Sequence, residues 1–524
     1  MIIALRFRPR WASLLFLLPL LCRPTVASSA VAGPIVRTAE GVVKGRLVDR
    51  MASFVGVPYA AAPIGPLRFA PPKAPTTWSG VRKATAFAPA CLQKGVSMPG
   101  EPPPRTSEDC LYLNVWSGVG GRGPKPVIVF FPGGGFTNGA TSLPLYAGDR
   151  LARRGVVVVT VAYRLGPLGF LALPELSKEA PDGASGDQGL LDQIAALEWV
   201  KRNVAAFGGD PSRVTIAGQS AGAMSVSLLM ASPPAKGLFS RAIAQSGGVF
   251  EPLAIAPSWR APAAEKQGLA YAASLGAKSL ADLRALPAEK LLEGTASQVS
   301  HPVVGGGVLP VSPYEAFQNG SISAVPLLLG RNADEARSLV DPARVRAASF
   351  EADVSKVWGA LPPALIAAYP HATDAEARRA RLDFERDLRF AWDMRTWARL
   401  QAGTGQPAYL YRFDQAPPFP AGSVRAGWGA SHFAELWYVF DHLDQERWRW
   451  SGSDRRLADQ MARYWTNFAK TGDPNGSGLP SWPRFELPRV QHLVLGTPVE
   501  RRELTTAPGL SAFDLVYGQL RAGR

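Results

Sequence analysis

A serine in the setting of a nucleophile stands near the middle of the chain. Ser220 lies in the pentapeptide Gly218–Gly222 (GQSAG), between the apolar run Val214–Ala217 and the helical segment Ala223–Met230. A sharp strand-to-helix turn of this Gly-x-Ser-x-Gly type points the serine hydroxyl outward and lets both elements approach closely. The pentapeptide alone also fits a tight turn with an inert serine, so its strand–turn–helix context is what favours a nucleophile.

A glycine run upstream could stabilise a negative oxygen. Gly133–Gly135 follow the apolar run Pro126–Phe131. Consecutive glycines let backbone N–H groups converge on one oxygen, as acyl transfer requires, although a flexible loop has the same composition. A second stretch, 118–123 (GVGGRG), matches a dinucleotide-binding pattern. It leads into Pro124 and a strand rather than a helix, so we interpret it as a turn.

Serine needs a base, and histidine is the usual one. The five candidates are His301, His371, His432, His442 and His492. In folds built on such a turn the chain order is nucleophile, acid, base, which excludes His301. His432 follows the small residues Gly429–Ser431 and precedes an aromatic helix start, so it is the favoured base, with His442 as its rival.

Two adjacent acids could orient that histidine. Asp334 and Glu335 follow the apolar run Ala324–Leu329, and strand ends are where such sites are built. A carboxylate there would hold the imidazole in the required tautomer and stabilise its charged form. Both residues fit that role, and either could instead cap a helix.

The elements around these residues predict an α/β fold. Apolar runs rich in Val, Ile or aromatics alternate with helical patterns, which is typical of a sheet covered by helices. Further expected strands are Leu111–Trp116, Val156–Ala162, Ala242–Ala244, Ala408–Phe413 and Leu493–Leu495, and expected helices include Leu190–Ala206 and Asp374–Arg395. No repeat or linker divides the chain, so we expect one domain with helical insertions.

The N-terminus resembles an export signal. Residues 1–27 join a basic start to the apolar run Trp11–Leu21 and small residues before a cleavage site, and the run is too short to span a membrane. Cleavage would leave residues 28–524 with two cysteines, Cys91 and Cys110. In an exported chain these two cysteines favour a disulfide over two buried thiols. Closing the loop between them would stabilise the fold by about 3 kcal/mol.

Composition excludes several classes. The chain has 524 residues, 47% of them hydrophobic and 19% charged, which is a globular balance with ample core. Its net charge of +15 is dispersed, and the nearest basic-aromatic block, Arg447–Trp450, is only four residues long. We therefore expect no nucleic-acid partner and no membrane span.

The motifs resemble, in order, those of type-B carboxylesterases, the group that includes cholinesterases and bacterial p-nitrobenzyl esterases. Similar blocks run from about Ala32 to Phe513 and include VPYAAAPIGPLRF, SEDCLYLNVW, FPGGGF, GDQGLLDQIAALEWVKRNVAAFGGDP, VPLLLGRNADEA and SHFAELWYVF. The resemblance implies an α/β-hydrolase fold: a large, mixed, mostly parallel sheet flanked by helices, with helical insertions over the active site.

The resemblance also assigns roles to single residues. It implies a triad of Ser220, Glu335 and His432, and oxyanion donors at Gly134, Gly135 and Ala221. Ser246 stands where the family places a serine that bonds the triad acid. The chain departs from the family pattern at Pro132, often His, at Ala336, often Gly, and at Gly305, often Asp.

Supporting positions follow in the same way. Arg68 and Glu108 occupy the family positions of a buried ion pair that pins the disulfide loop. Four aromatics are candidates for the substrate pocket: Phe136, Trp428, Phe433 and Trp437. The Cys91–Cys110 loop and the segments Val249–Gly307 and Glu351–Trp428 should form its rim.

The sequence thus predicts an exported, periplasmic or secreted serine esterase that cleaves small to medium organic esters through an acyl-enzyme, without metal or cofactor. One alternative is an esterase for polyanionic ester side chains, of the fumonisin tricarballylate type, which the positive charge would suit. Another is a non-catalytic binding protein like the family's adhesion members, although all three triad residue types stand in order here. The sequence leaves the oligomeric state open.

Overall fold

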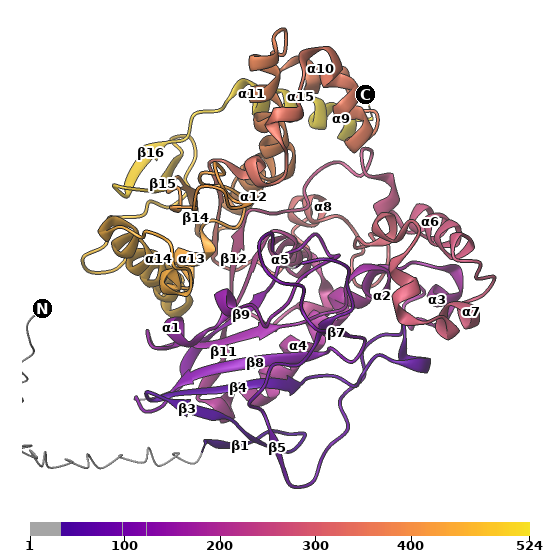
Figure 1. Ribbon diagram of the computed structural model, residues 1–524, viewed down its shortest axis with the longest axis vertical. Coiled ribbons are helices and arrows are strands. Elements are labelled where there is room, and N and C mark those ends of the chain that lie inside the picture. Colours follow the sequence, from indigo (N-terminus) through magenta and orange to yellow (C-terminus); the bar gives the residue numbers. More distant parts are fainter. Residues whose placement is uncertain (1–32, 97, 122, 524) are drawn as a thin grey trace, which may run out of the picture. The chain divides into compact units, whose positions relative to one another are not determined.

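An eleven-stranded sheet forms the centre of the fold (Figure 1). The computed structural model describes residues 33–96, 98–121 and 123–523, so the expected signal peptide, residues 1–27, lies outside the described part. In spatial order the strands are β16 (Glu500–Glu503), β15 (Gln491–Leu495), β14 (Ala408–Phe413), β13 (Leu327–Asn332), β12 (Arg241–Gln245), β11 (Gly209–Gln219), β9 (Lys125–Phe131), β10 (Val157–Val161), β8 (Tyr112–Gly118), β4 (Met51–Pro58) and β3 (Arg46–Val48).

Neighbouring strands from β15 to β10 run parallel, and the strands at both edges pair antiparallel. This is the mixed, mostly parallel sheet that the sequence predicts. Two small sheets accompany it, one of β1 (Ile35–Arg37), β2 (Val42–Lys44) and β5 (Val81–Lys83), the other of β6 (Ala90–Cys91) and β7 (Thr106–Ser107).

The central strands are apolar on both faces because helices cover both. In β9, Val127 and Val129 belong to one buried cluster, while the alternating Ile128 and Phe130 belong to another. All five residues of β10 are buried. Continuous apolar runs therefore marked these strands correctly.

Helices follow most of the parallel strands. They are α1 (Asp149–Ala152), α2 (Gly166–Phe170), α3 (Pro174–Glu179), α4 (Gln188–Asn203), α5 (Ala221–Ala231), α6 (Ala261–Ser274), α7 (Leu280–Ala285), α8 (Pro313–Gln318), α9 (Phe350–Trp358), α10 (Pro363–Ala367), α11 (Asp374–Arg386), α12 (Trp392–Ala402), α13 (Leu436–Val439), α14 (Gly452–Thr471) and α15 (Pro508–Arg521). In Figure 1 the C-terminal helix α15 lies among α9, α10 and α11, and it contacts α10.

Two sequence expectations need correction. The helix expected over Asp374–Arg395 is two α-helices, α11 and α12, joined by a π-helical turn at Asp387–Ala391. A π turn keeps helical periodicity nearly intact, so the sequence pattern does not reveal it. The strand expected at Ala324–Leu329 begins at Leu327, because Pro326 has no N–H for the ladder.

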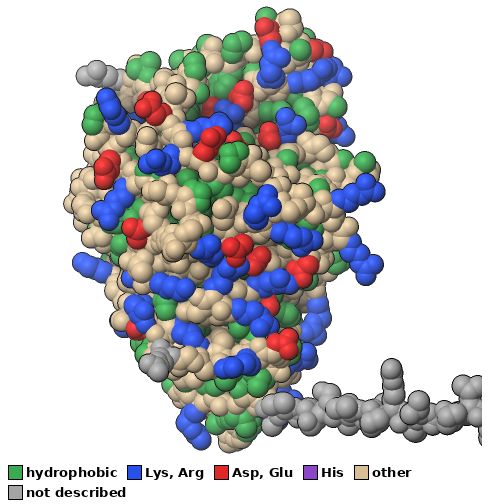
Figure 2. Space-filling view, turned by 90° about the vertical axis from the view of Figure 1, so that its left-hand side faces the viewer, with side chains coloured by type: hydrophobic (Ala, Val, Ile, Leu, Met, Phe, Trp, Pro, Cys, Tyr) green, Lys and Arg blue, Asp and Glu red, His purple; other side chains and the backbone are tan. Residues whose placement is uncertain are grey.

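Two further features of the described part concern its helices and its surface charge. None of the helices in the described part is long and apolar enough to cross a membrane. Lys and Arg side chains are spread over the face shown in Figure 2, with acids among them. The stretch after β8 leads to β9 and not to a helix, as expected for a turn.

Candidate active site

Ser220 occupies a strained turn between β11 and α5. Its backbone has φ 58° and ψ −126°, a combination that costs a non-glycine residue on the order of 1–3 kcal/mol. Only glycine fits beside it: a Cβ on Gly222 would lie 1.9 Å from the carbonyl oxygen of Phe131. The Ser220 N–H donates to the carbonyl of Gln245 at 2.8 Å, which ties the turn to β12. The side chain is thereby presented to a cavity.

His432 and Glu335 form a buried pair beside this turn. Nδ1 of His432 lies 2.6 Å from Oε2 of Glu335, and the side chains are 2% and 0% exposed. Because Nδ1 donates to the carboxylate, Nε2 is left as the acceptor. His432 lines the same cavity as Ser220.

Of the two adjacent acids, Glu335 alone contacts the histidine. Asp334 accepts the N–H of Ala430 at 3.0 Å and pairs with Arg337 at 3.0 Å. The rival base His442 contacts the carbonyl of Ala147 at 2.7 Å and is not among the residues that line this cavity.

Two further groups hold Glu335 in place. The Ser246 hydroxyl donates to Oε1 of Glu335 at 2.6 Å, and the Asn332 N–H donates to the same oxygen at 2.7 Å. Ser246 thus lies where the resemblance implied. Asn332 was not singled out from the sequence, although it stands three residues before Glu335 at the end of β13.

A second buried carboxylate adjoins this network. Glu435 is fully buried and accepts the side-chain amides of Asn332 at 2.5 Å and Gln245 at 3.1 Å. Burial, and secondly the charge of Glu335, raise the pKa of Glu435 to about 7. Its position three residues after His432 was the available sequence signal.

Two more side chains contact the imidazole. The ring of Phe390, from the π-helical turn, stacks on His432 with centroids 4.5 Å apart. The Gln219 amide nitrogen lies 3.3 Å from Nε2 and can donate to its lone pair. Neither contact was expected from the sequence, because the π turn that carries Phe390 was not predicted and Gln219 was noted only as part of the motif around Ser220.

The glycine loop after β9 borders the same space. Gly134 and Gly135 have φ of 123° and 60°, and both line the cavity with Ala221. A Cβ on Gly134 would lie 2.1 Å from the Asn138 carbonyl oxygen, so the close turn requires glycine. At the departure Pro132, the carbonyl accepts the Tyr163 hydroxyl at 2.9 Å.

The cavity has a volume of about 800 Å³, within the range of small-molecule sites. Phe136 and Phe433 line it. Trp428 and Trp437 do not: Trp437 packs against Trp448 with ring centroids 5.0 Å apart, and Trp428 lies near Phe419.

Aromatics from the inserted segments line the wall instead. Trp259, Trp358 and Phe390 belong to the two rim segments that the sequence suggested, and Lys94, Gly95, Val96 and Pro99 come from the disulfide loop. These residues are far apart in the sequence and meet only in the fold. The sequence therefore did not indicate which tryptophans line the cavity.

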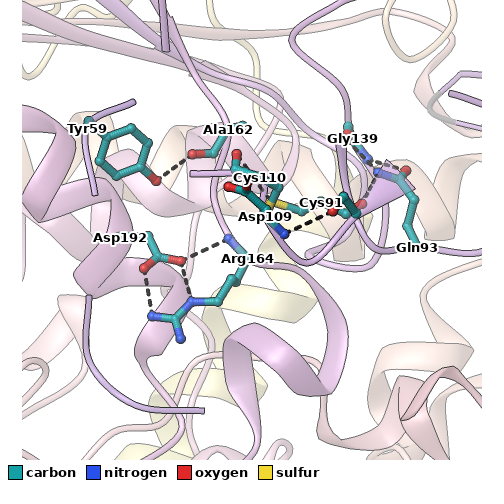
Figure 3. Close-up of a disulfide and its surroundings, with 10 residues drawn as sticks. Tyr59, Cys91, Gln93, Asp109, Cys110, Gly139, Ala162, Arg164 and Asp192 are labelled. Carbon is teal, nitrogen blue, oxygen red and sulfur yellow. Dashed lines mark hydrogen bonds and ion pairs between the residues drawn. A yellow bond between two sulfur atoms is a disulfide. The ribbon is translucent and has the colours of Figure 1, made fainter. Parts of the chain in front are cut away.

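The disulfide between Cys91 and Cys110 is present, as predicted (Figure 3). Gln93, inside its loop, binds the backbone of Gly139 through both ends of its amide, at 2.7 and 2.9 Å. This joins the disulfide loop to the segment after the glycine loop.

Two ion pairs surround this loop. Arg68 binds Glu108 through two hydrogen bonds of 2.6 Å and also donates to the Leu286 carbonyl at 2.7 Å. Arg164 and Asp192, drawn in Figure 3, form a pair at 2.7 Å that is almost fully buried and was not predicted. The described residues include no group of three His, Cys, Asp or Glu side chains suited to a metal ion.

Comparison with known proteins agrees with this geometry. Residues 32–509 match the model of the carboxylesterase family. The chain is 37% identical to the fumonisin B1 esterase of Sphingopyxis macrogoltabida, covering 90% of this chain and 88% of that protein. It is 34% identical to the para-nitrobenzyl esterase of Bacillus subtilis, covering 89% of this chain and 95% of that one.

Solved structures give the same result. A PNB esterase structure superposes with a TM-score of 0.79 at 32% identity, covering 91% of this chain and 99% of that one. The fold is therefore that of the α/β-hydrolases, and the relatives named as esterases favour an enzyme over a non-catalytic adhesion protein. The chain belongs to the carboxylesterase family and is a carboxylic ester hydrolase.

Proposed function

We propose that the protein hydrolyses small to medium organic esters through a Ser220–His432–Glu335 triad. The observation that carries this proposal is the buried 2.6 Å contact between Glu335 and His432, a histidine that lines the same cavity as Ser220. Nucleophile turn, base and orienting acid thus come from three segments far apart in sequence.

In the first half-reaction, the Ser220 oxygen attacks the ester carbonyl carbon while Nε2 of His432 accepts the hydroxyl proton. The carbonyl oxygen becomes an oxyanion beside the N–H groups of Gly134, Gly135 and Ala221. The bond to the alcohol oxygen then breaks, and His432 returns the proton to the leaving alcohol.

In the second half-reaction, water attacks the acyl-enzyme and gives a proton to His432. The bond to the Ser220 oxygen breaks, the proton returns to serine, and the carboxylic acid leaves. Glu335 keeps Nδ1 protonated throughout and stabilises the imidazolium. No step draws on a metal or cofactor.

Hydrolysis of p-nitrophenyl esters over a series of acyl lengths tests the proposal, with Ser220→Ala alongside. We expect activity in the wild type and its loss in the variant. Covalent labelling of Ser220 by an organophosphonate gives a second readout. A folded wild-type protein that neither hydrolyses the series nor takes the label contradicts the proposal.

A second candidate substrate class is an ester with anionic side chains. Lys94 and Arg389 line the cavity. Glu385 pairs with both Arg389, at 2.7 Å, and Arg381, at 2.8 Å, so one carboxylate faces two guanidiniums and positive charge remains. The relative named as a fumonisin B1 esterase supports the same class.

Matched esters separate the two classes. The p-nitrophenyl monoester of succinate carries a carboxylate where the p-nitrophenyl ester of butanoate has a methyl group. A preference for succinate that Arg389→Gln removes supports the anionic class, and a preference for butanoate in the wild type contradicts it. A polycarboxylate ester of the tricarballylate type is the next substrate.

We also propose that residues 1–27 direct export to the periplasm or the medium and are removed, and that residues 28–524 form one domain. The disulfide supports an oxidising compartment. N-terminal sequencing of the protein recovered from the cell envelope or the medium tests both the export and the cleavage.

A further inference from the structure

One wall of the cavity carries a carboxylate that the proposed mechanism does not use. Glu251 stands five residues after Ser246, in the loop that follows β12, and lines the cavity. Gly247, in the same loop, packs against Ser220: a Cβ there would lie 2.4 Å from the Ser220 carbonyl oxygen. The loop therefore leads directly from the triad to Glu251.

The charge of Glu251 is poorly compensated. Its Oε2 is buried and has no hydrogen-bond partner among the described residues. Arg521, the nearby cation, donates instead to the carbonyl of Phe250 and lies over the ring of Tyr314, 3.5 Å from the centroid. Burial raises the pKa of Glu251, as expected for a carboxylate without a close cation.

The groups behind Glu251 do not supply that partner. Asp393 is 2% exposed, and its Oδ1 accepts the Phe250 N–H at 3.2 Å, while its Oδ2 also lacks a hydrogen-bond partner within residues 33–96, 98–121 and 123–523. Burial, and secondly the charge of Glu251, raise the pKa of Asp393 well above its usual range. Of this pair, Glu251 is the member that borders the cavity, so it is the carboxylate that a substrate group can reach.

A second lone acceptor lines the same cavity. Nδ1 of His301 is 3.1 Å from the Pro302 carbonyl oxygen, so in the neutral ring Nδ1 carries the proton and Nε2 the lone pair. Nε2 is buried and has no hydrogen-bond partner in the described part of the chain, and the ring stacks on Trp259 with centroids 5.3 Å apart. Burial lowers the pKa of His301, which keeps the ring neutral.

We propose that these two acceptors form a subsite for the hydrogen-bond donors of a substrate, with a protonated amine bound by Glu251 and a further N–H or O–H accepted by His301. Among the described lining residues, Glu251 is the one carboxylate, so it determines where a cation binds. The inference rests on the proposed esterase function only in taking the amine to belong to an ester substrate.

Binding of small probes tests the subsite without relying on hydrolysis. Calorimetry on the Ser220→Ala variant would compare hexylammonium, 1-hexanol and hexanoate, which share one alkyl chain. A hydrogen bond between charged groups predicts that hexylammonium binds at least about tenfold more tightly than hexanol. Equal affinities in this comparison, which needs no Glu251 variant, overturn the proposal.

Variants then locate the cation. Glu251→Gln should remove the preference for hexylammonium, whereas Glu251→Asp, which keeps the charge, should retain part of it. Glu293→Gln is the matched control, because Glu293 is exposed and pairs with Lys290 outside the cavity. A preference that persists in Glu251→Gln contradicts the assignment.

His301→Phe keeps an aromatic ring on Trp259 but removes the acceptor. We expect this variant to bind 6-amino-1-hexanol, which has two donor groups, more weakly than the wild type does. Its affinity for hexylammonium should be unchanged. If the wild type fails to hydrolyse esters but the ammonium preference is present, the subsite stands and the proposed function fails. If the wild type hydrolyses esters but shows no preference for hexylammonium, the proposed function stands and the subsite fails.

Discussion

The buried carboxylates of Glu335 and Glu435 are joined through one residue, Asn332. The Asn332 backbone N–H donates to Glu335 at 2.7 Å, and its side-chain amide donates to Glu435 at 2.5 Å. Both carboxylates are fully buried. Glu335 also has His432 as a partner, whereas the partners of Glu435 among the described residues are neutral amides, so burial and the nearby charge of Glu335 raise the pKa of Glu435.

This relationship makes stability depend on pH. The pKa of Glu435 is about 7 in the folded protein, against 4.5 for an ordinary glutamate. Between these values the folded state binds a proton that the unfolded state releases, so stability falls as pH rises from about 4.5 to about 7 and is level above that. The difference is on the order of 3 kcal/mol.

The variant Glu435→Gln should not show this fall in stability with rising pH. We expect the thermal midpoint of the wild type to fall, relative to that of the variant, between pH 5 and pH 8. Thermal unfolding in matched buffers measures it. Parallel pH profiles for the two proteins would mean that Glu435 has no raised pKa.

Replacing the orienting acid should reduce turnover far more than replacing its neighbour. Glu335→Gln removes the charge next to Nδ1 of His432, and loss of an orienting carboxylate costs about 10⁴ in kcat in a comparable triad. Asp334→Asn is the control, since Asp334 contacts Ala430 and Arg337 instead. The measurement is kcat for a p-nitrophenyl ester in both variants. Similar losses in the two would contradict the assignment of Glu335 as the orienting acid.

The three proposed triad residues were easier to single out from the sequence than the side chains that surround them. Ser220, Glu335 and His432 stand in motifs at strand ends, where residue type and order carry information. Phe390 reaches His432 through a π-helical turn, and the cavity tryptophans come from inserted segments whose packing depends on the whole fold. Local pattern does not encode such long-range contacts.

The same contrast holds for the fold. Parallel strands such as β10 are buried on both faces and read as plain apolar runs, so their existence followed from composition. The early strands β1 to β3 have three residues each and mostly exposed or half-buried side chains. They carry no such signal, and tertiary pairing defines them.

The Ser246 hydroxyl should contribute to catalysis through Glu335. Ser246→Ala removes a 2.6 Å bond to a buried carboxylate, and hydrogen bonds to charged groups are worth about 1.5–3 kcal/mol, or roughly 10- to 100-fold in kcat. Ser232→Ala is a matched control because the buried Ser232 hydroxyl has no partner in the described part of the chain. Steady-state kinetics with equal kcat in the two variants would exclude this role.

The disulfide should stabilise the protein and shape the cavity mouth. For a loop of this length the chain-entropy estimate is about 3 kcal/mol. We expect the double variant Cys91→Ala, Cys110→Ala to lose that much free energy of unfolding. KM should rise more than kcat falls, because Lys94 and Pro99 of the loop line the cavity while no proposed triad residue belongs to the loop. Denaturant unfolding and steady-state kinetics measure the two effects, and an unchanged KM would show that the loop does not bind substrate.

The ring of Phe390 should hold the imidazole of His432 in place. Phe390→Leu keeps an apolar side chain but removes the stack, and aromatic pairs are worth about 0.5–1.5 kcal/mol, so kcat should fall roughly 2- to 12-fold. The chain offers a matched control in Phe350, which stacks on His371 at 4.3 Å outside the cavity. Phe350→Leu should cost similar stability and leave kcat unchanged. If both variants lower kcat equally, the effect is one of stability, and the stack on His432 has no part in positioning the base.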